Sequence, residues 1–207
     1  MWLAVVTAVL VSYMLGNLNG AVCISALMND DVRSHGSGNA GLTNFVRNFG
    51  AGRGLLVILI DASKAVLACL ASGLLLEPYF GYLTGVAAGG TAVMLGHVFP
   101  ALLGFRGGKG VLSGLFIALM TDWRIALMIL AVFAVAYLLT QYVSLGSVLA
   151  AITFGVGYGV FHYDTLPVML CGIFMSLLVV YMHRANILRL IRGEERKTNL
   201  FKRGDRK

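Results

Sequence analysis

The sequence contains few charged residues. Only 12% of its 207 residues are Asp, Glu, Lys or Arg, whereas 58% are hydrophobic, and the mean hydropathy is +0.85. A soluble domain carries about 25% charged residues. Long apolar runs recur along the whole chain instead, and a run of roughly 20 apolar residues is enough to cross a bilayer core about 30 Å thick. The sequence therefore predicts an all-α polytopic membrane protein without a soluble domain.

Cysteine is also scarce, and its spacing argues against a metal site. Cys23, Cys69 and Cys171 lie far apart, each within an apolar run, so we expect them to be small packed side chains. The first apolar run lacks a basic segment before it and a clean cleavage site, and it continues into "MLGNLNGAVCISALM". We therefore expect this run to be a retained span, not a signal peptide.

Two glycine-rich stretches resemble nucleotide-binding loops but lack what those loops require. "HGSGNAGLTN" (residues 35–44) matches the pattern G-x-G-x-x-G, yet a dinucleotide site needs a preceding strand, and here an apolar span precedes. "GFRGGKG" (residues 104–110) has Gly110 where a P-loop has Ser or Thr. Both stretches can still turn backbone N–H groups toward an anion. The alternative for the first stretch is a flexible interfacial loop.

The apolar segments and the basic residues together predict the topology. Nine of the sixteen Lys and Arg residues lie between Arg184 and Lys207, and cytoplasmic segments are rich in these residues. An outside N-terminus and a cytoplasmic C-terminus place fourteen of the sixteen inside. We expect one membrane domain (1–197) and a basic tail (198–207) that contacts anionic lipid, not nucleic acid. The seven predicted spans lie near residues 3–28, 53–76, 82–103, 110–123, 124–142, 145–162 and 166–184.

This topology brings four polar stretches to the cytoplasmic face, where they can form a single site. They are "SHGSGNAGLTNFVRNFG", "GHVFPALLGFRGGKG", the turn with Ser144, and "HRANILRLIRGEERK". The first supplies neutral donors and Arg47, whose planar guanidinium suits a phosphate group. The second supplies Lys109 as a point charge. Together they indicate an anion-binding surface at a membrane interface.

Charged residues outside these patterns have structural interpretations. Asp61 and Lys64 lie within the second predicted span at i, i+3, where charges are costly and are either paired or functional. We expect a structural pair that lines the bundle interior, and a proton or ion relay is the alternative. His97 taken alone is more often a structural histidine. The remaining basic side chains along the last helix are expected to contact the membrane surface, namely Arg189, Arg192 and Arg196.

Three long motifs then point to a family. In their order and spacing, "GSGNAGLTNFVR", "GHVFPALLGFRGGKG" and "HRANILRLIRGEERK" resemble the signature motifs of the bacterial membrane glycerol-3-phosphate acyltransferases of the PlsY type. The resemblance covers residues 1–197. It implies transfer of an acyl group from acyl phosphate to the 1-hydroxyl of glycerol 3-phosphate, giving lysophosphatidate and phosphate. It also implies a bacterial plasma-membrane location with the site facing the cytoplasm, and neither a cofactor nor a metal.

The resemblance also implies which residues form the site. The predicted catalytic residues are Ser37, Arg47, Lys109, His183 and Asn186. The predicted substrate-binding residues are Gly38, Asn39, Thr43, Asn44, His97, Gly107, Gly108 and Ser144. Acyl chain length and oligomeric state are left open by the sequence.

A missing motif shapes the expected mechanism. No histidine is followed five residues later by Asp, so the H-x-x-x-x-D dyad of another acyltransferase superfamily is absent. Acyl phosphate already carries a good leaving group, and Arg47 and Lys109 can stabilise the developing charge. We therefore expect direct attack by the glycerol hydroxyl without an acyl-enzyme, its proton passing to a substrate phosphate or to His183.

Two alternative functions fit parts of the sequence less well. A small transporter of a phosphorylated or anionic metabolite would use the Asp61–Lys64 pair and the basic face, but it predicts internal repeats, and none is evident. A head-group transferase of the CDP-alcohol kind needs an Asp-rich metal motif, which the nine acidic residues do not form. The high density of phosphate-suited residues also disfavours a purely structural membrane scaffold.

Overall fold

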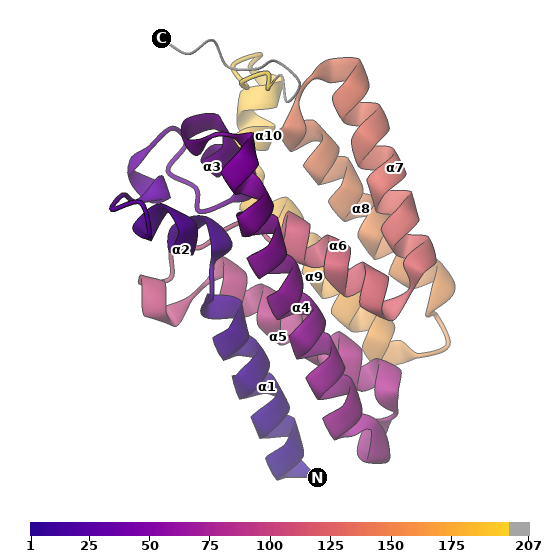
Figure 1. Cartoon of the computed structure of the whole chain (residues 1–207). Coiled ribbons are helices and arrows are strands. Elements are labelled where there is room, and N and C mark those ends of the chain that lie inside the picture. Colours follow the sequence, from indigo (N-terminus) through magenta and orange to yellow (C-terminus); the bar gives the residue numbers. More distant parts are fainter. Residues whose placement is uncertain (199–207) are drawn as a thin grey trace.

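The computed structural model describes residues 1–198, and within them the chain forms helices joined by short connections (Figure 1). The elements are α1 (Trp2–Asn17), α2 (Gly20–Ala26), η1 (Val32–Ser34), α3 (Leu42–Phe49), α4 (Ala51–Phe80), α5 (Tyr82–Val98), η2 (Ala101–Leu103), α6 (Val111–Thr121), α7 (Trp123–Thr140), α8 (Val143–Phe161), α9 (Leu166–Met182) and α10 (Arg184–Ile191).

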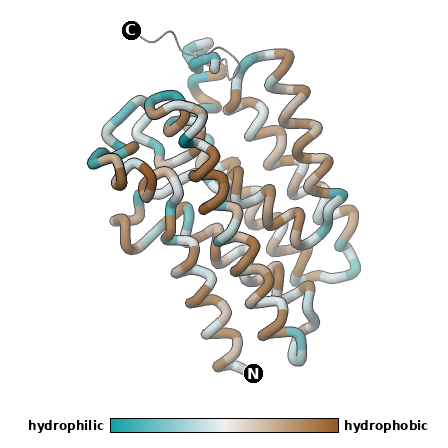
Figure 2. Tube along the Cα trace, viewed as in Figure 1, coloured by the Kyte–Doolittle hydropathy of each residue, from teal (hydrophilic) through white to brown (hydrophobic). Residues whose placement is uncertain are grey.

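The outer surfaces of the long helices are apolar. Leu59, Leu67 and Leu74 of α4 and Leu138 and Leu139 of α7 are all exposed, and apolar positions dominate the length of the bundle in Figure 2. A soluble protein avoids such extended apolar surfaces. The predicted all-helical membrane protein is therefore confirmed.

Helix length and composition leave the predicted count of seven spans unconfirmed. Within residues 1–198, four helices are long and apolar enough to cross a membrane, namely α4, α5 with η2, α7 and α8. The count rises to six if the bent pairs α1–α2 and α9–α10 each form one span, with bends of 45° and 54°. The predicted fourth span is the short helix α6, of 11 residues.

The first predicted span is broken at Leu18, because Asn19 there starts a new helix. α1 ends at Asn17, Leu18 is extended, and Asn19 caps the new helix α2, its side chain accepting a 3.0 Å hydrogen bond from the backbone nitrogen of Val22. Asparagine favours such N-cap positions. An apolar run alone does not reveal this break.

The core of the bundle is centred on α5. This helix packs against α1, α4, α6 and α9, while α7 packs on α8 and α8 on α9. The buried core cluster includes Val93 and Met94 of α5, Ile117 of α6 and Tyr158 of α8. These contacts hold α6 and α8 beside the central helices, and both helices carry residues of the candidate site.

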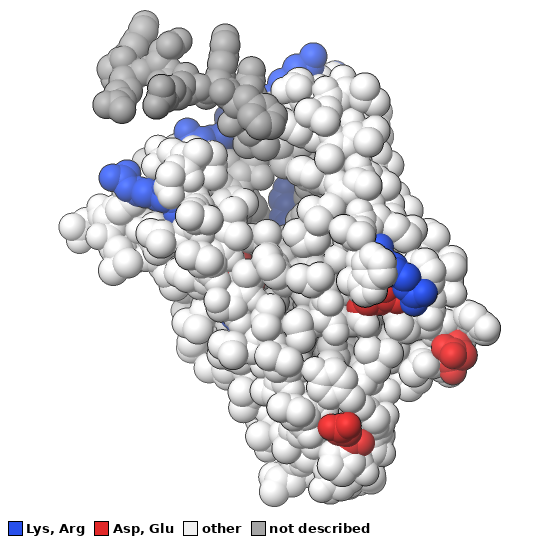
Figure 3. Space-filling model, turned by 45° about the vertical axis from the view of Figure 1, so that its right-hand side comes forward, with Lys and Arg blue, Asp and Glu red and all other residues white. Residues whose placement is uncertain are grey.

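The segments that carry the three motifs gather at one end of the bundle. In Figure 1, α3 and α10, which carry parts of the first and third motifs, lie toward the end opposite the N-terminus. Figure 3 shows Lys and Arg side chains gathered at that end, around a recess. The fold therefore brings together stretches that are far apart in the sequence.

Candidate active site

A cavity of about 500 Å³ lies at this end of the bundle. It is lined by residues from all four polar stretches, so their predicted convergence is confirmed. The predicted site residues that line it are Ser37, Asn39, Thr43, Asn44, Arg47, His97, Lys109, Ser144, His183 and Asn186. The predicted substrate-binding glycines Gly38, Gly107 and Gly108 do not line it. Their backbone conformation and close packing shape the two loops instead.

Asn44 organises the first loop. Its amide nitrogen donates to the carbonyls of Val32 (3.0 Å), His35 (3.0 Å) and Asn39 (3.1 Å), and its oxygen accepts from the backbone nitrogen of Ser37 at 3.1 Å. The side chain is only 3% exposed. Both polar atoms of Asn44 are thus used within the loop, which Gly38 helps to turn at a positive φ of 69°.

Helix α3 carries Thr43 and Arg47 to the cavity. They lie four residues apart, and therefore on one face of the helix, while Phe45 on another face is completely buried and stacks on Phe49. The Arg47 guanidinium donates to Thr198 and, at 3.5 Å, to the carbonyl of Arg196. Burial of the phenylalanines fixes the helix so that its polar face meets the cavity.

The second loop packs tightly on His97. The backbone nitrogen of Gly108 donates to the carbonyl of His97 at 3.1 Å. A Cβ atom on Gly107 would overlap that carbonyl, and one on Gly108 would overlap Nε2 of His97. These glycines are therefore needed for close packing, and they place the next residue, Lys109, at the cavity.

Lys109 is a half-buried cation with one hydrogen-bond partner in residues 1–198, the side-chain oxygen of Asn186. The pKa of Lys109 is lowered from 10.5 to about 8, and burial is the largest cause. The positive charges of Arg189 and Arg47 contribute to this lowered pKa, and the Glu195 carboxylate opposes them. An ammonium group with N–H donors that are not used by the protein, at the wall of a cavity, can bind an oxyanion.

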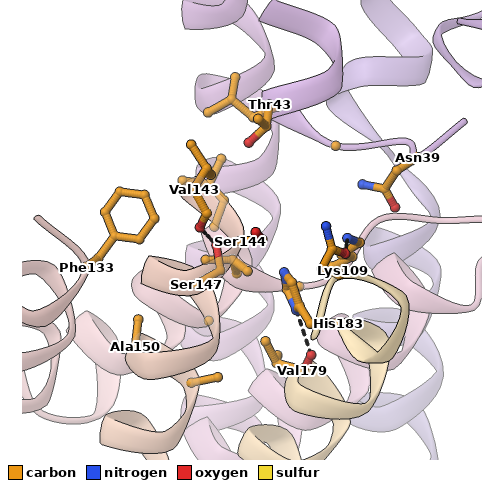
Figure 4. Close-up of a pocket in the computed structure, with 18 of the residues that line it drawn as sticks. Asn39, Thr43, Lys109, Phe133, Val143, Ser144, Ser147, Ala150, Val179 and His183 are labelled. Atoms are coloured by element: carbon orange, nitrogen blue, oxygen red, sulfur yellow. Dashed lines mark hydrogen bonds between the residues drawn. The ribbon is translucent and has the colours of Figure 1, made fainter. Parts of the chain in front are cut away.

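His183 faces Lys109 across the polar part of the cavity (Figure 4). Its Nδ1 lies 2.8 Å from the carbonyl of Val179, which can only accept, so the proton is on Nδ1 and Nε2 is an acceptor. The ring is 3% exposed. This arrangement provides a neutral acceptor beside a cation.

Glu195 is a site residue that the sequence analysis missed. Glu195 accepts from Asn186 at 2.8 Å and from Arg189 at 2.7 Å. Burial disfavours its ionisation, but these hydrogen bonds outweigh burial and hold its pKa below the ordinary value of 4.5. Gly193, with φ of 71°, ends α10 and turns the chain back. Gly193 was the signal in the sequence from which this turn could have been predicted.

The last basic residues, which were expected to contact the membrane surface, divide between the cavity and the exposed surface. Arg189 and Arg196 line the cavity, whereas Arg192 is exposed and does not line it. Thr198, the first residue of the predicted tail, is buried, and its carbonyl accepts a hydrogen bond from Tyr137 at 2.8 Å. The rest of the predicted tail, residues 199–207, lies outside the described residues.

The other part of the cavity is apolar. Leu112 and Leu115 of α6, Leu130 and Phe133 of α7, and Phe154 of α8 line it. In Figure 4, Phe133 and Ala150 lie away from Lys109 and His183, with Ser144 and Ser147 between. One cavity therefore joins a cationic, hydrogen-bonding part to a wall suited to a hydrocarbon chain.

Comparisons with known proteins agree with this geometry. The sequence profile of the family described as glycerol-3-phosphate acyltransferase matches residues 6–193. The chain belongs to the glycerol-3-phosphate acyltransferase family. A glycerol-3-phosphate acyltransferase of Finegoldia magna is 37% identical over 190 residues, covering 91% of this chain and 93% of the relative. One of Anaeromyxobacter dehalogenans is 42% identical over 201 residues, covering 92% and 96%.

Solved structures of a family member share the fold. PlsY (YgiH), an integral membrane glycerol 3-phosphate acyltransferase, matches in its glycerol 3-phosphate form with a TM-score of 0.86 and 32% identity, over 96% of this chain and 99% of that chain. Its lysophosphatidic acid form matches with a TM-score of 0.83, over 95% and 96%. The predicted family is confirmed, and membership decides against the transporter and head-group transferase alternatives.

Proposed function

We propose that this protein transfers the acyl group of an acyl phosphate to the 1-hydroxyl of glycerol 3-phosphate, forming lysophosphatidate and inorganic phosphate. One observation carries the proposal, namely a single cavity with phosphate-suited donors at one part and an apolar wall at the other. Both substrates carry a phosphate, and only the donor carries a long chain. Family membership supports the acceptor and the product, while the anionic donor fits the density of cations.

The reaction needs one bond made and one broken. The glycerol hydroxyl oxygen attacks the acyl carbon, and the bond from that carbon to the phosphate oxygen breaks, releasing phosphate without an acyl-enzyme. Lys109, Arg47 and Ser37 donate to the departing phosphate and to the charge that builds on the acyl oxygen. The hydroxyl proton passes to a substrate phosphate oxygen or to Nε2 of His183, the two acceptors that this geometry offers.

The other predicted site residues divide by their contacts. We assign Asn39, Thr43 and Ser144 to substrate contact because they line the cavity. Asn186 holds Lys109 in place, and Asn44 and the glycines shape the loops. We further propose that seven apolar segments span a bacterial plasma membrane, α6 among them, with the N-terminus outside and the cavity facing the cytoplasm, and that residues 1–197 form one domain without cofactor or metal.

A direct assay tests this function. Purified protein in lipid receives palmitoyl phosphate and glycerol 3-phosphate, and both phosphate and lysophosphatidate are measured. We expect both products in equal amounts, strongly reduced rates for Ser37→Ala, Arg47→Ala and Lys109→Ala, and no turnover when glycerol replaces glycerol 3-phosphate. No product from the native protein, or unchanged rates in all three variants, contradicts the proposal.

Two further arms separate the finer claims. Replacing palmitoyl phosphate by palmitoyl-CoA tests the donor, and we expect no product. A radiolabelled palmitoyl group that stays covalently bound to the protein after denaturation contradicts direct attack. His183→Gln separates the two proton acceptors, because a substrate phosphate as acceptor leaves most of the activity in that variant.

A further inference from the structure

A buried polar cluster lies beneath the two motif loops. Lys64 Nζ is 2.8 Å from Oδ1 of Asp61 and 2.7 Å from Nδ1 of His97, and the pair predicted for Asp61 and Lys64 is thereby confirmed. The three residues are 2%, 2% and 4% exposed. Because an ammonium group only donates, Nδ1 of His97 accepts and the imidazole is neutral. The cluster is a buried ion pair with a histidine attached, and Asp61 and His97 also line the cavity.

On one side, the cluster supports the break between α1 and α2. Lys64 also donates to the carbonyls of Leu18 at 2.6 Å and Gly16 at 3.3 Å, and Asp61 accepts from the backbone nitrogen of Gly20 at 3.2 Å. Backbone groups freed by a helix break inside a membrane protein need such partners. The cluster therefore fixes the backbone on both sides of Asn19.

The α1–α2 break, which the cluster holds in place, positions the side chain of Asn19 against the first loop. Asn19 is completely buried, and its amide nitrogen donates to the carbonyl of Ala40 at 2.9 Å. Ala40 lies between Asn39 and Gly41, in the middle of the loop that Asn44 holds together. The position of this loop thus depends on where the α1–α2 break is held.

On its other side, the cluster supports the second loop. The carbonyl of His97 accepts from Gly108 at 3.1 Å, and the residue after Gly108 is Lys109. A Cβ on Gly108 would lie only 3.0 Å from the carbonyl of Ala40, so the two loops meet at this glycine. One buried ion pair is therefore linked to both loops through Asn19 and His97.

We propose that Lys64, together with Asp61, is a positioning residue for the acyl transfer, which sets the separation of the Ser37–Arg47 loop from Lys109. This inference rests on the proposed function, since it explains how two loops grip two phosphorylated substrates at once. A buried ion pair is weak evidence for stability, because apolar substitutes often serve as well. Its links to both loops give it a role beyond joining helices.

The test separates stability from activity. Asp61→Asn/Lys64→Met removes both charges and leaves no lone buried ion, and Ser72→Ala is the matched control, because Ser72 joins the same helices α4 and α1 through a buried bond to Ser12 at 2.9 Å. The melting temperature, and kcat and KM for each substrate, are measured. We expect the double variant to lose about 10²-fold in catalytic efficiency, and the control to keep native kinetics.

The result that overturns the inference is a folded double variant with native kcat and KM. Asn19→Ala keeps the question decidable if the double variant does not fold, since it cuts only the link to Ala40 and the cap of α2. We expect Asn19→Ala to lose about tenfold in catalytic efficiency while melting near the Ser72→Ala control, by the sensitivity of catalysis to small misplacements. Native kinetics in Asn19→Ala then overturn the inference.

A conservative variant distinguishes positioning from a proton or ion relay. The Asn oxygen in Asp61→Asn still accepts from Lys64 and Gly20, so positioning predicts activity close to native, whereas a relay through the carboxylate predicts nearly complete loss. An inactive native protein overturns the proposed function together with this inference. An active native protein with an unaffected double variant overturns the inference alone.

Discussion

Two lysines, Lys64 and Lys109, lie near the two motif loops and use their N–H donors differently. Lys64 is 2% exposed and donates to Asp61, His97 and two backbone carbonyls. Lys109 is half-buried and has a single partner in residues 1–198, the oxygen of Asn186. An ammonium group has three N–H donors. The four acceptors around Lys64 occupy all three of its N–H donors, whereas Lys109 has two N–H donors left for a ligand.

The comparison separates side chains that hold the site from those that act in it. A saturated cation stabilises the groups around it and has nothing to offer a substrate. A partly satisfied cation costs stability and gains it back when an anion arrives. The same contrast applies to polar neighbours, since Asn44 is saturated by its loop while Thr43 faces the cavity.

Lys109→Met produces the largest loss of activity. Removing one preorganised donor from a developing oxyanion costs about 10²–10³-fold in rate, and the site loses a charge as well. We expect kcat/KM to fall by at least this range in the phosphate-release assay. Arg106→Met is the control, because Arg106 is exposed on the same loop. Equal losses in both variants attribute the effect to loop charge in general.

Asn44→Ala comes next, because it removes a saturated side chain. The loop carbonyls of Val32, His35 and Asn39 each lose one donor but keep a backbone N–H donor, and the backbone nitrogen of Ser37 loses the Asn44 oxygen as acceptor. Each lost hydrogen bond costs about 0.5–1.5 kcal/mol. We expect a lower melting temperature and a loss of about 10²-fold in activity through misplaced loop donors. Thr43→Ala is the counterpart and lowers activity at a native melting temperature. The opposite pattern contradicts our division of roles.

A smaller effect concerns pH. Lys109 is cationic below its pKa of about 8, so catalytic efficiency falls as pH rises through that value. Besides Arg189, the groups facing Lys109 are Arg47, Glu195 and His183. Arg189 lowers this pKa, so Arg189→Gln moves the alkaline limb to higher pH, whereas Arg192→Gln, exposed beyond α10, leaves it in place. A limb that does not move, or moves to lower pH, contradicts the assignment.

The same pKa makes a prediction for stability. The folded value of about 8 lies below the ordinary value of 10.5, so between these pH values the unfolded chain binds more protons than the folded one. Stability contributed by Lys109 therefore rises with pH across this window. Melting temperatures of native protein and Lys109→Met, measured from pH 7 to pH 10, converge if this sign is correct.

The smallest predicted effect concerns Ser72→Ala. It removes the buried bond to Ser12 far from the loops, which costs about 1 kcal/mol of unfolding free energy. We expect native kcat and KM, because neither motif loop depends on this bond. A raised KM would show that any weakening of the α1–α4 contact disturbs the site, and would remove the special role of Lys64.

Much of this architecture could be predicted because it depends on local composition. Apolar runs predicted the helices, and basic residues predicted which loops share an end. The i, i+3 spacing predicted the pairing of Asp61 with Lys64. These features follow from neighbours in the chain.

Features that depend on distant partners were missed. The apolar run hides the helix break at Leu18: Asn19 is a residue that favours a helix N-cap, but the support that Lys64 gives the break comes from another helix. Asn44 looked like a ligand-binding amide, because its loop acceptors become visible only after folding. Glu195 resembles its exposed neighbour Glu194 in sequence, and only the turn at Gly193 brings one of them to Asn186.

The most direct test of the contrast between the two lysines is the melting temperature of Lys64→Met and Lys109→Met under identical conditions at pH 7. Lys64→Met leaves Asp61 as a lone buried charge, and breaking a buried pair costs about 3–5 kcal/mol. We therefore predict a large fall for Lys64→Met and an equal or higher melting temperature for Lys109→Met. A Lys109→Met protein that melts as low as Lys64→Met contradicts the account.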